Sequence, residues 1–121
     1  MNGRFSTYKK AKWMDDLAGT DLWLGVCWAN PLIASDPLTT EVPVTRQYAL
    51  WVRSSPTLLT LNIAEVFRNL LPGAVVAAVA VWDAAIGGHL IGADLYQVPI
   101  SYPTGGTHTI ASGQFVLGID V

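Results

Sequence analysis

Charged side chains are scarce in this sequence. Only 13% of its 121 residues are Asp, Glu, Lys or Arg, whereas 51% are hydrophobic. The charged share is about half of what an average soluble domain carries. This composition excludes intrinsic disorder, and it leaves few groups that could solvate an apolar surface. We therefore expect part of the surface to be covered by neighbouring subunits, in a homo-oligomer or in several symmetric copies.

Disulfides and long apolar runs are also lacking. Cys27 is the only cysteine, so no intramolecular disulfide can form, and its apolar surroundings predict a small buried hydrophobe in a protein that folds in a reducing cytosol. The longest apolar stretch, 70–82, is short and contains Pro72 and Gly73, so it cannot span a bilayer. Trp13-Met14-Asp15-Asp16 follows the first basic residues in place of an apolar signal core. We expect neither a secretion signal nor a membrane partner.

Positive charge is absent from most of the chain but concentrated at its start. The net charge of −2 creates no field that would recruit nucleic acid, so no specific nucleic-acid partner is expected. Four charges on one short helix most often form a solvated face or dock on an acidic neighbour. We interpret them as a candidate anchoring arm formed by Arg4, Lys9, Lys10 and Lys12.

Patterns typical of catalysis and metal binding are missing. His89 and His108 have no cysteine, histidine or carboxylate at metal-ligand spacing, so each is expected to be an exposed or singly hydrogen-bonded loop histidine, with no metal or cofactor. Ser112 lacks a nucleophile elbow. Turn capping and solvation explain Asp83 and Asp94 better than a glycosidase pair does. The sequence therefore predicts a protein that is not an enzyme.

The first part of the chain predicts one helix. Apolar residues recur at helical spacing over 5–18, Ser6 or Thr7 can cap the start, and Gly19 supplies a stop. Such a short helix requires docking to be stable. Residues 1–20 are accordingly interpreted as a basic helical arm.

The rest of the chain has the alternation of β-strands. The runs 22–28 and 74–82 are apolar in both parities and are expected inside a sheet, whereas Pro43 places 42–52 at an edge or at a strand entrance. Residues 61–68 would also suit one helical turn, although a strand is favoured. Strands are predicted at 22–28, 42–52, 58–67, 74–82, 89–95 and 115–121.

Turn residues separate these strands. Turns are predicted at 54–56 and 71–73, hairpins at Gly87-Gly88 and Gly105-Gly106, and interruptions at Pro99 and Pro103. Short strands with turns between them predict that residues 21–121 form an all-β domain, an antiparallel β-sandwich of the jelly-roll or Ig-like kind.

Tryptophan and tyrosine are numerous for a chain of this length. Five tryptophans and four tyrosines point to a tryptophan-rich core with a protein interface, for which Trp13, Trp23 and Trp51 are the candidates. A sugar-stacking platform that uses Trp23 or Trp51 is the alternative. In the structural hairpin, Trp82 is expected to close the hydrophobic layer, Asp83 to cap the turn, and Gly87 and Gly88 to reverse the chain.

Several short motifs follow one another in a recognisable order. They are Leu22-Trp23-Leu24-Gly25-Val26 before Asn30-Pro31, Thr45-Arg46-Gln47, Asn62-Ile63-Ala64-Glu65-Val66, Val81-Trp82-Asp83-Ala84-Ala85 with Gly87-Gly88, and Ala111-Ser112-Gly113-Gln114-Phe115-Val116-Leu117. This order over residues 10–121 resembles small virion proteins of tailed bacteriophages, of the tail-fibre or minor tail type. The most specific part is 82–90, which fits the pattern W-D-A-x-x-G-G-x-L.

The resemblance implies a non-enzymatic structural protein of a phage virion, made in the cytoplasm of the host bacterium. It implies attachment to capsid or tail subunits, as a capsid decoration, a head–tail accessory or a minor tail or fibre component. No catalytic residue is implied. A carbohydrate-binding or host-recognition module of the virion is the alternative.

Overall fold

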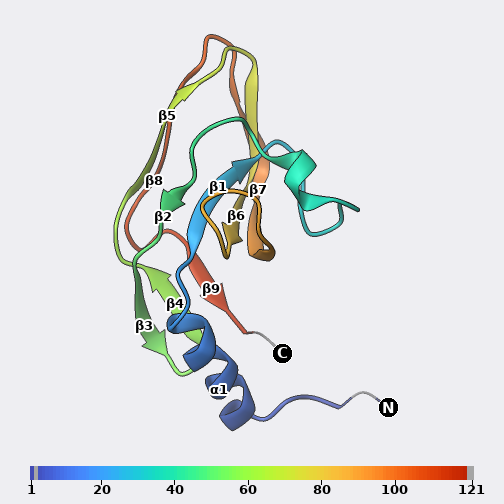
Figure 1. The fold of residues 1–121 in the computed structure, drawn as a ribbon, viewed down its shortest axis with the longest axis vertical. Coiled ribbons are helices and arrows are strands. Elements are labelled where there is room, and N and C mark those ends of the chain that lie inside the picture. Colours follow the sequence, from blue (N-terminus) through green and yellow to red (C-terminus); the bar gives the residue numbers. More distant parts are fainter. Residues whose placement is uncertain (2, 120–121) are drawn as a thin grey trace.

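The computed structural model describes residue 1 and residues 3–119. Over these residues the expected all-β, antiparallel architecture with one short N-terminal helix is confirmed (Figure 1). The elements are α1 (Thr7–Ala18), β1 (Trp23–Cys27), the 3₁₀ helix η1 (Pro37–Thr40), β2 (Gln47–Tyr48), β3 (Trp51–Ser55), β4 (Leu58–Leu61), β5 (Glu65–Leu70), β6 (Ala74–Trp82), β7 (Leu90–Tyr102), β8 (Gly106–Ile110) and β9 (Val116–Gly118).

The strands form three antiparallel sheets. Their orders are β2-β1-β6-β7, β3-β4-β9 and β5-β8. In Figure 1 the β5–β8 ribbon runs beside the four-stranded sheet, and β3, β4 and α1 lie at the lower end. The strands predicted to be interior, β1 and β6, occupy the two central positions of the largest sheet, as their apolar residues at both parities require.

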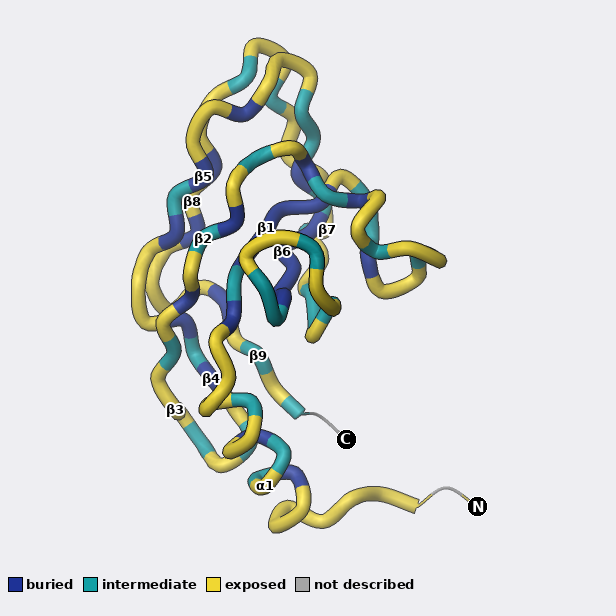
Figure 2. Tube along the Cα trace, in the orientation of Figure 1, coloured by how far each residue is buried: buried dark blue, intermediate teal, exposed yellow. Residues whose placement is uncertain are grey.

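One hydrophobic core joins the three sheets. Figure 2 shows buried chain along β1 and β6 and on the strands that face them. Phe67 and Ile110 of the β5–β8 ribbon pack in one cluster with Val76 and Val79 of β6, and Leu61 of β4 belongs to the same cluster. A second small cluster consists of Cys27, Ala78, Ala80 and Trp82. Burial of Cys27, which raises its thiol pKa, matches the expected role as a hydrophobe.

The predicted N-terminal helix is present and begins at Thr7. Ser6 caps it by accepting a hydrogen bond from the Lys9 backbone N–H, and Gly19 ends it. Met14 is fully buried beneath the helix. Arg53 of β3 fixes the helix on the β3–β4 hairpin, because its guanidinium donates to Asp15 Oδ1 at 2.6 Å and to the Ala11 carbonyl at 3.2 Å.

The single strand predicted over 42–52 is wrong. Val42 donates its backbone N–H to Val26, but regular pairing begins only at β2, an edge strand as Pro43 suggested, and β3 belongs to another sheet. The face turned toward the core also changes. Val42 and Arg46 are buried, whereas Ala49 is the buried residue after the chain has passed from one sheet to the other.

The strand predicted over 58–67 is two strands. Residues 62–64 are exposed and separate β4 from β5, and the latter continues to Leu70. Within 61–68 the favoured strand is confirmed over the helix, since no residue there is helical. The preceding turn also lies later than predicted, because Ser54 and Ser55 belong to β3 and the chain reverses at 56–57.

The last part of the chain departs from prediction, because the strand predicted over 89–95 extends to Tyr102 and β8 was not predicted. β7 passes through Pro99 and ends at Tyr102, where an interruption was expected. Proline is tolerated there because β7 is an edge strand and the ladder is already irregular, with Leu95 opposite Ala78 and Ile100 opposite Val76. The final strand, predicted over 115–121, is observed as β9, and the last residues of that prediction, 120 and 121, lie outside the described part.

Candidate functional site

Arg46 is a buried cation that holds three segments together. Its Nε donates to Glu41 Oε1 at 2.6 Å, and its Nη1 donates to the carbonyls of Ala84 and Gly87, each at 2.7 Å. The guanidinium also lies over the Trp82 ring, with Cζ 4.2 Å from the centroid. Arg46 therefore fixes the turn between β6 and β7, although in the sequence it stood out only as part of the motif Thr45-Arg46-Gln47.

A glycine makes room for this arrangement. A Cβ at Gly25 would lie 3.1 Å from Trp82 Nε1 and 3.3 Å from Glu41 Oε1. Both neighbours are held, the first by burial and the second by its ion pair with Arg46. Three of the motifs that carry the phage resemblance therefore meet in one place, which we call the Arg46 node and define as Gly25, Glu41, Arg46 and Trp82.

The predicted hairpin residues take the expected positions around the node. Trp82 is buried, and Asp83 caps the turn by accepting the His89 backbone N–H at Oδ1, 2.6 Å away. This bond, with the contact from Oδ2 to His89 Nδ1, lowers the pKa of Asp83. Gly87 and Gly88 have positive φ, and a Cβ at Gly88 would clash with the Asp83 carboxylate.

His108 is not the exposed or singly bonded loop residue that we expected. It lies on β8, is buried, and is held between two phenols, with Nε2 2.7 Å from Tyr96 Oη and Nδ1 2.7 Å from Tyr102 Oη. Burial lowers the pKa of His108. A neutral imidazole satisfies both phenols, because one ring nitrogen donates and the other accepts. The other histidine, His89, is exposed as predicted.

Glu65 is a second buried titratable group. Its side chain enters the interior from β5, and its Oε1 has no hydrogen-bond donor among the described residues. Burial raises the pKa of Glu65 to about 7. Within the described part of the chain, no three His, Cys, Asp or Glu residues lie close enough together to hold a metal ion.

No family model and no curated protein matches this chain. None of the helices in the described residues is long and apolar enough to cross a membrane.

The candidate interface tryptophans differ in their surroundings. Trp13 and Trp23 are half-buried, and each contacts one further aromatic ring edge-on, Phe5 and Tyr48 respectively. Trp51 packs against the main core with its ring 5.9 Å from that of Phe115.

The most exposed tryptophan is one that we had not selected. Trp28 is 54% exposed and is held in place because its Nε1 donates to the Thr39 carbonyl. Its place at the end of the run 22–28, next to Asn30-Pro31, was the available signal.

The four basic residues of the candidate arm also differ in their burial and contacts. Lys10 is buried, so the four residues do not form one solvated face. Lys9 lies over the Trp13 ring and Lys12 over the Tyr8 ring, at 5.7 and 5.5 Å from the centroids. Arg4 is exposed and has no hydrogen bond or ion pair to any described residue.

Apolar side chains cover much of the exterior. A groove of about 370 Å³ between the loop 31–38 and the start of β7 has Leu32 and Leu38 in its lining. Ile33 lies on the same loop, and Ile86 lies on the turn whose Gly88 lines the groove. We call these four exposed residues, Leu32, Ile33, Leu38 and Ile86, the loop patch. Ile33 and Ile86 are 82% and 91% exposed. A monomeric protein in water rarely leaves such groups together.

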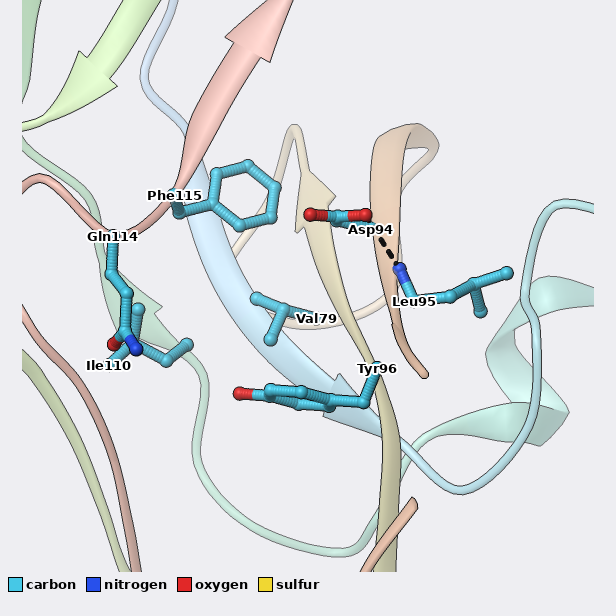
Figure 3. A pocket seen from close by; sticks show the side chains of 7 residues that line it. All are labelled: Val79, Asp94, Leu95, Tyr96, Ile110, Gln114 and Phe115. Carbon is cyan, nitrogen blue, oxygen red and sulfur yellow. Dashed lines mark hydrogen bonds between the residues drawn. The ribbon is translucent and has the colours of Figure 1, made fainter. Parts of the chain in front are cut away.

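A smaller pocket lies where β6, β7 and β8 meet the segment before β9. Its volume is about 130 Å³, and its walls include Val79, Tyr96, Ile110 and Phe115. Figure 3 shows Asp94 as the charged group on this apolar lining. Its Oδ1 accepts the Leu95 backbone N–H at 2.9 Å, and its Oδ2 has no hydrogen-bond partner among the described residues.

Proposed function

We propose that this chain is a non-enzymatic structural protein of a tailed-phage virion, which attaches to capsid or tail subunits through apolar and aromatic contacts. Capsid decoration, head–tail accessory and minor tail or fibre component all fit this role. The jelly-roll or Ig-like sandwich class, and the division into an arm of residues 1–20 and a domain of residues 21–121, stay predictions.

The loop patch is the observation that carries the proposal. Ile33 and Ile86 extend into solvent, and the turn bearing Ile86 is rigidly held, since it is bonded to Arg46 on one side and capped by Asp83 on the other. An apolar tip on a rigid turn loses little conformational entropy when a partner covers it. The phage context comes from the motif order, and three of those motifs build the node beneath this turn.

The test uses the phage whose genome encodes the chain. With the gene deleted, the protein is supplied in trans as wild type, as the Ile33→Asp/Ile86→Asp variant, or as the control Thr104→Asp/Ser112→Asp, which adds the same charge at exposed polar positions. We expect wild type and control in gradient-purified particles and the loop-patch variant in the soluble fraction. A wild-type chain that is absent from particles would overturn the proposal.

A second function is favoured by one arrangement of aromatic groups. Trp23 and Tyr48 lie edge-on at 5.5 Å, and the Tyr48 hydroxyl donates to Asp21 Oδ1 at 2.8 Å. An aromatic platform beside a carboxylate suits a sugar, which stacks on the ring and hydrogen-bonds to the acid. Glycan-array binding that is lost in Trp23→Ala and kept in Trp13→Ala would support host recognition, and equal binding by both variants would exclude this site.

A further inference from the structure

The pocket at Asp94 has the chemistry of a site for one cationic side chain. Its volume of about 130 Å³ is well below the roughly 300–1,000 Å³ of pockets that hold drug-sized ligands. The Tyr96 ring forms its floor in Figure 3, and the Phe115 ring lies beside the Asp94 carboxylate. Asp94 is exposed, so its free oxygen lies at the mouth of the pocket beside the aromatic walls. A carboxylate in this position recognises a guanidinium or ammonium group through a charge-assisted hydrogen bond and cation–π contact.

The chain itself offers one matching cation on an extended segment. Of its seven basic residues, Lys10 and Arg46 are buried, Arg53 is paired with Asp15, and Lys9 and Lys12 lie on their own aromatic rings. Arg68 is exposed, but it is part of the paired strand β5. Among the described residues, Arg4 is therefore the exposed cation that lies outside any helix or strand and has no aromatic or acidic partner.

The geometry of the arm presents Arg4 outward. Phe5 is fixed by its edge-on contact with Trp13 of α1, with ring centroids 4.5 Å apart, and Arg4 comes one residue before this anchor. The segment before α1 extends outward from the lower end of the molecule (Figure 1). It is exposed along its described length (Figure 2). An arm that extends outward reaches the pocket of a second molecule more readily than it reaches the pocket of its own chain.

We propose that Arg4 of one copy inserts into the pocket of a second copy and pairs with Asp94, so that the arm links copies of this chain. The negative charge of Asp94 attracts the positive charge of Arg4, and the apolar walls of the pocket pack against the methylene groups of the arginine. The inference rests on the proposed function only for the expectation that copies meet at high local concentration. It deepens that proposal by naming a contact between them.

Sedimentation velocity over a range of protein concentrations tests the contact. The wild-type chain is expected to self-associate, and Arg4→Gln or Asp94→Asn should each weaken the association constant by about tenfold or more. The charge-swapped double variant Arg4→Asp/Asp94→Arg should recover most of the loss. Arg68→Gln, which removes an exposed arginine elsewhere, should have no effect. Urea unfolding of each variant confirms that the fold is unchanged.

Three results would overturn the inference. They are a wild-type chain that stays monomeric at every concentration, association that neither single variant weakens, and a swapped variant that recovers nothing. Incorporation of the wild-type chain into phage particles distinguishes failure of the arm contact from failure of the proposed function. Wild-type incorporation without self-association would remove only the arm contact, whereas self-association of a chain that is absent from particles would remove only the virion role.

Discussion

Among single residues, Arg46 has the widest structural influence. A buried guanidinium is costly unless its charge and donors are compensated. Here a carboxylate and two carbonyls accept from Nε and Nη1 and an indole face lies against the group, while Nη2 has no hydrogen-bond partner among the described residues. Removal of any one partner would leave charge uncompensated in the interior. The node therefore fixes the turn that bears Ile86, with no catalytic role required of it.

Gly25 provides a test of how closely the node is packed. An alanine methyl at this position would approach Trp82 and Glu41 to 3.1 and 3.3 Å, and neither can retreat without losing its contacts with Arg46. We expect Gly25→Ala to lower the free energy of unfolding by about 1–3 kcal/mol in urea titrations. The matched control is Gly19→Ala, where the nearest atoms are 3.7 Å away and φ is −84°. Equal stability of the two variants would show that the node tolerates expansion.

Glu65 should make stability depend on pH. Its carboxyl has a pKa of about 7 in the folded chain against 4.5 as its usual value, so the folded state holds the proton more tightly than the unfolded state. Stability contributed by the neutral acid is therefore complete below about pH 4.5 and is lost as the pH rises to about 7, by at most about 3 kcal/mol. Glu65→Gln should remove this loss and unfold at higher urea than wild type at pH 8. A wild-type chain that is more stable to urea than Glu65→Gln at pH 8 would contradict the raised pKa of Glu65.

At the level of elements, prediction succeeded where the signal is local. The cap at Ser6, the stop at Gly19, the doubly apolar runs of β1 and β6, and the glycine pairs of both hairpins each act within a few residues. Such signals can be identified in the sequence because they do not depend on what packs against them. The helix, the interior strands and the turn around Asp83 were accordingly placed correctly.

Prediction failed where the chain changes sheet. Residues 42–52 are apolar in both parities around Ala49, so alternation could not reveal that the face toward the core switches there. Pro99 was predicted to interrupt the strand. The irregular pairing that tolerates it on an edge strand depends on the tertiary structure, so it could not be identified in the sequence. The Arg46 node joins residues far apart in sequence, and the two phenols on His108 come from the neighbouring strand β7 at separations of 12 and 6 residues, so no spacing rule predicts either arrangement.

The β7–β8 hairpin carries a pH effect of the opposite sign to that of Glu65. Burial holds the pKa of His108 below its usual 6.5, so as the pH falls the unfolded chain binds a proton on this histidine before the folded chain does. The stability from this neutral histidine is complete above about pH 6.5 and is lost as the pH falls below it.

In Glu65→Gln, where the competing slope is absent, urea stability should rise between pH 5 and 7. Adding His108→Gln should flatten that rise, because the amide can donate to one phenol and accept from the other without titrating. An unchanged slope in the double variant would assign the effect to another group.

At the scale of the whole molecule, the side chains that stabilise the fold differ from the exposed apolar side chains that we propose contact other proteins. The core consists of residues such as Val76 and Phe67, with no exposed surface, whereas Ile33 and Ile86 of the loop patch and Val98, which is 77% exposed, bury little area within the chain. A chain with so few charges can thus fold around one apolar set and present another. The two sets should respond differently to the same kind of substitution.

The triple variant Ile33→Thr/Ile86→Thr/Val98→Thr tests this separation. We expect its unfolding free energy to stay within about 0.5 kcal/mol of wild type for each substitution, because these side chains are mostly solvated in the folded state. Retention on a hydrophobic-interaction column should fall clearly. The control Val76→Thr, which places a hydroxyl in the core, should lose about 1–3 kcal/mol of stability and keep its native-state retention. If the triple variant unfolded as readily as the core variant, the exposed residues would have to belong to the folding unit, and an adhesive exterior separate from the core could not be maintained.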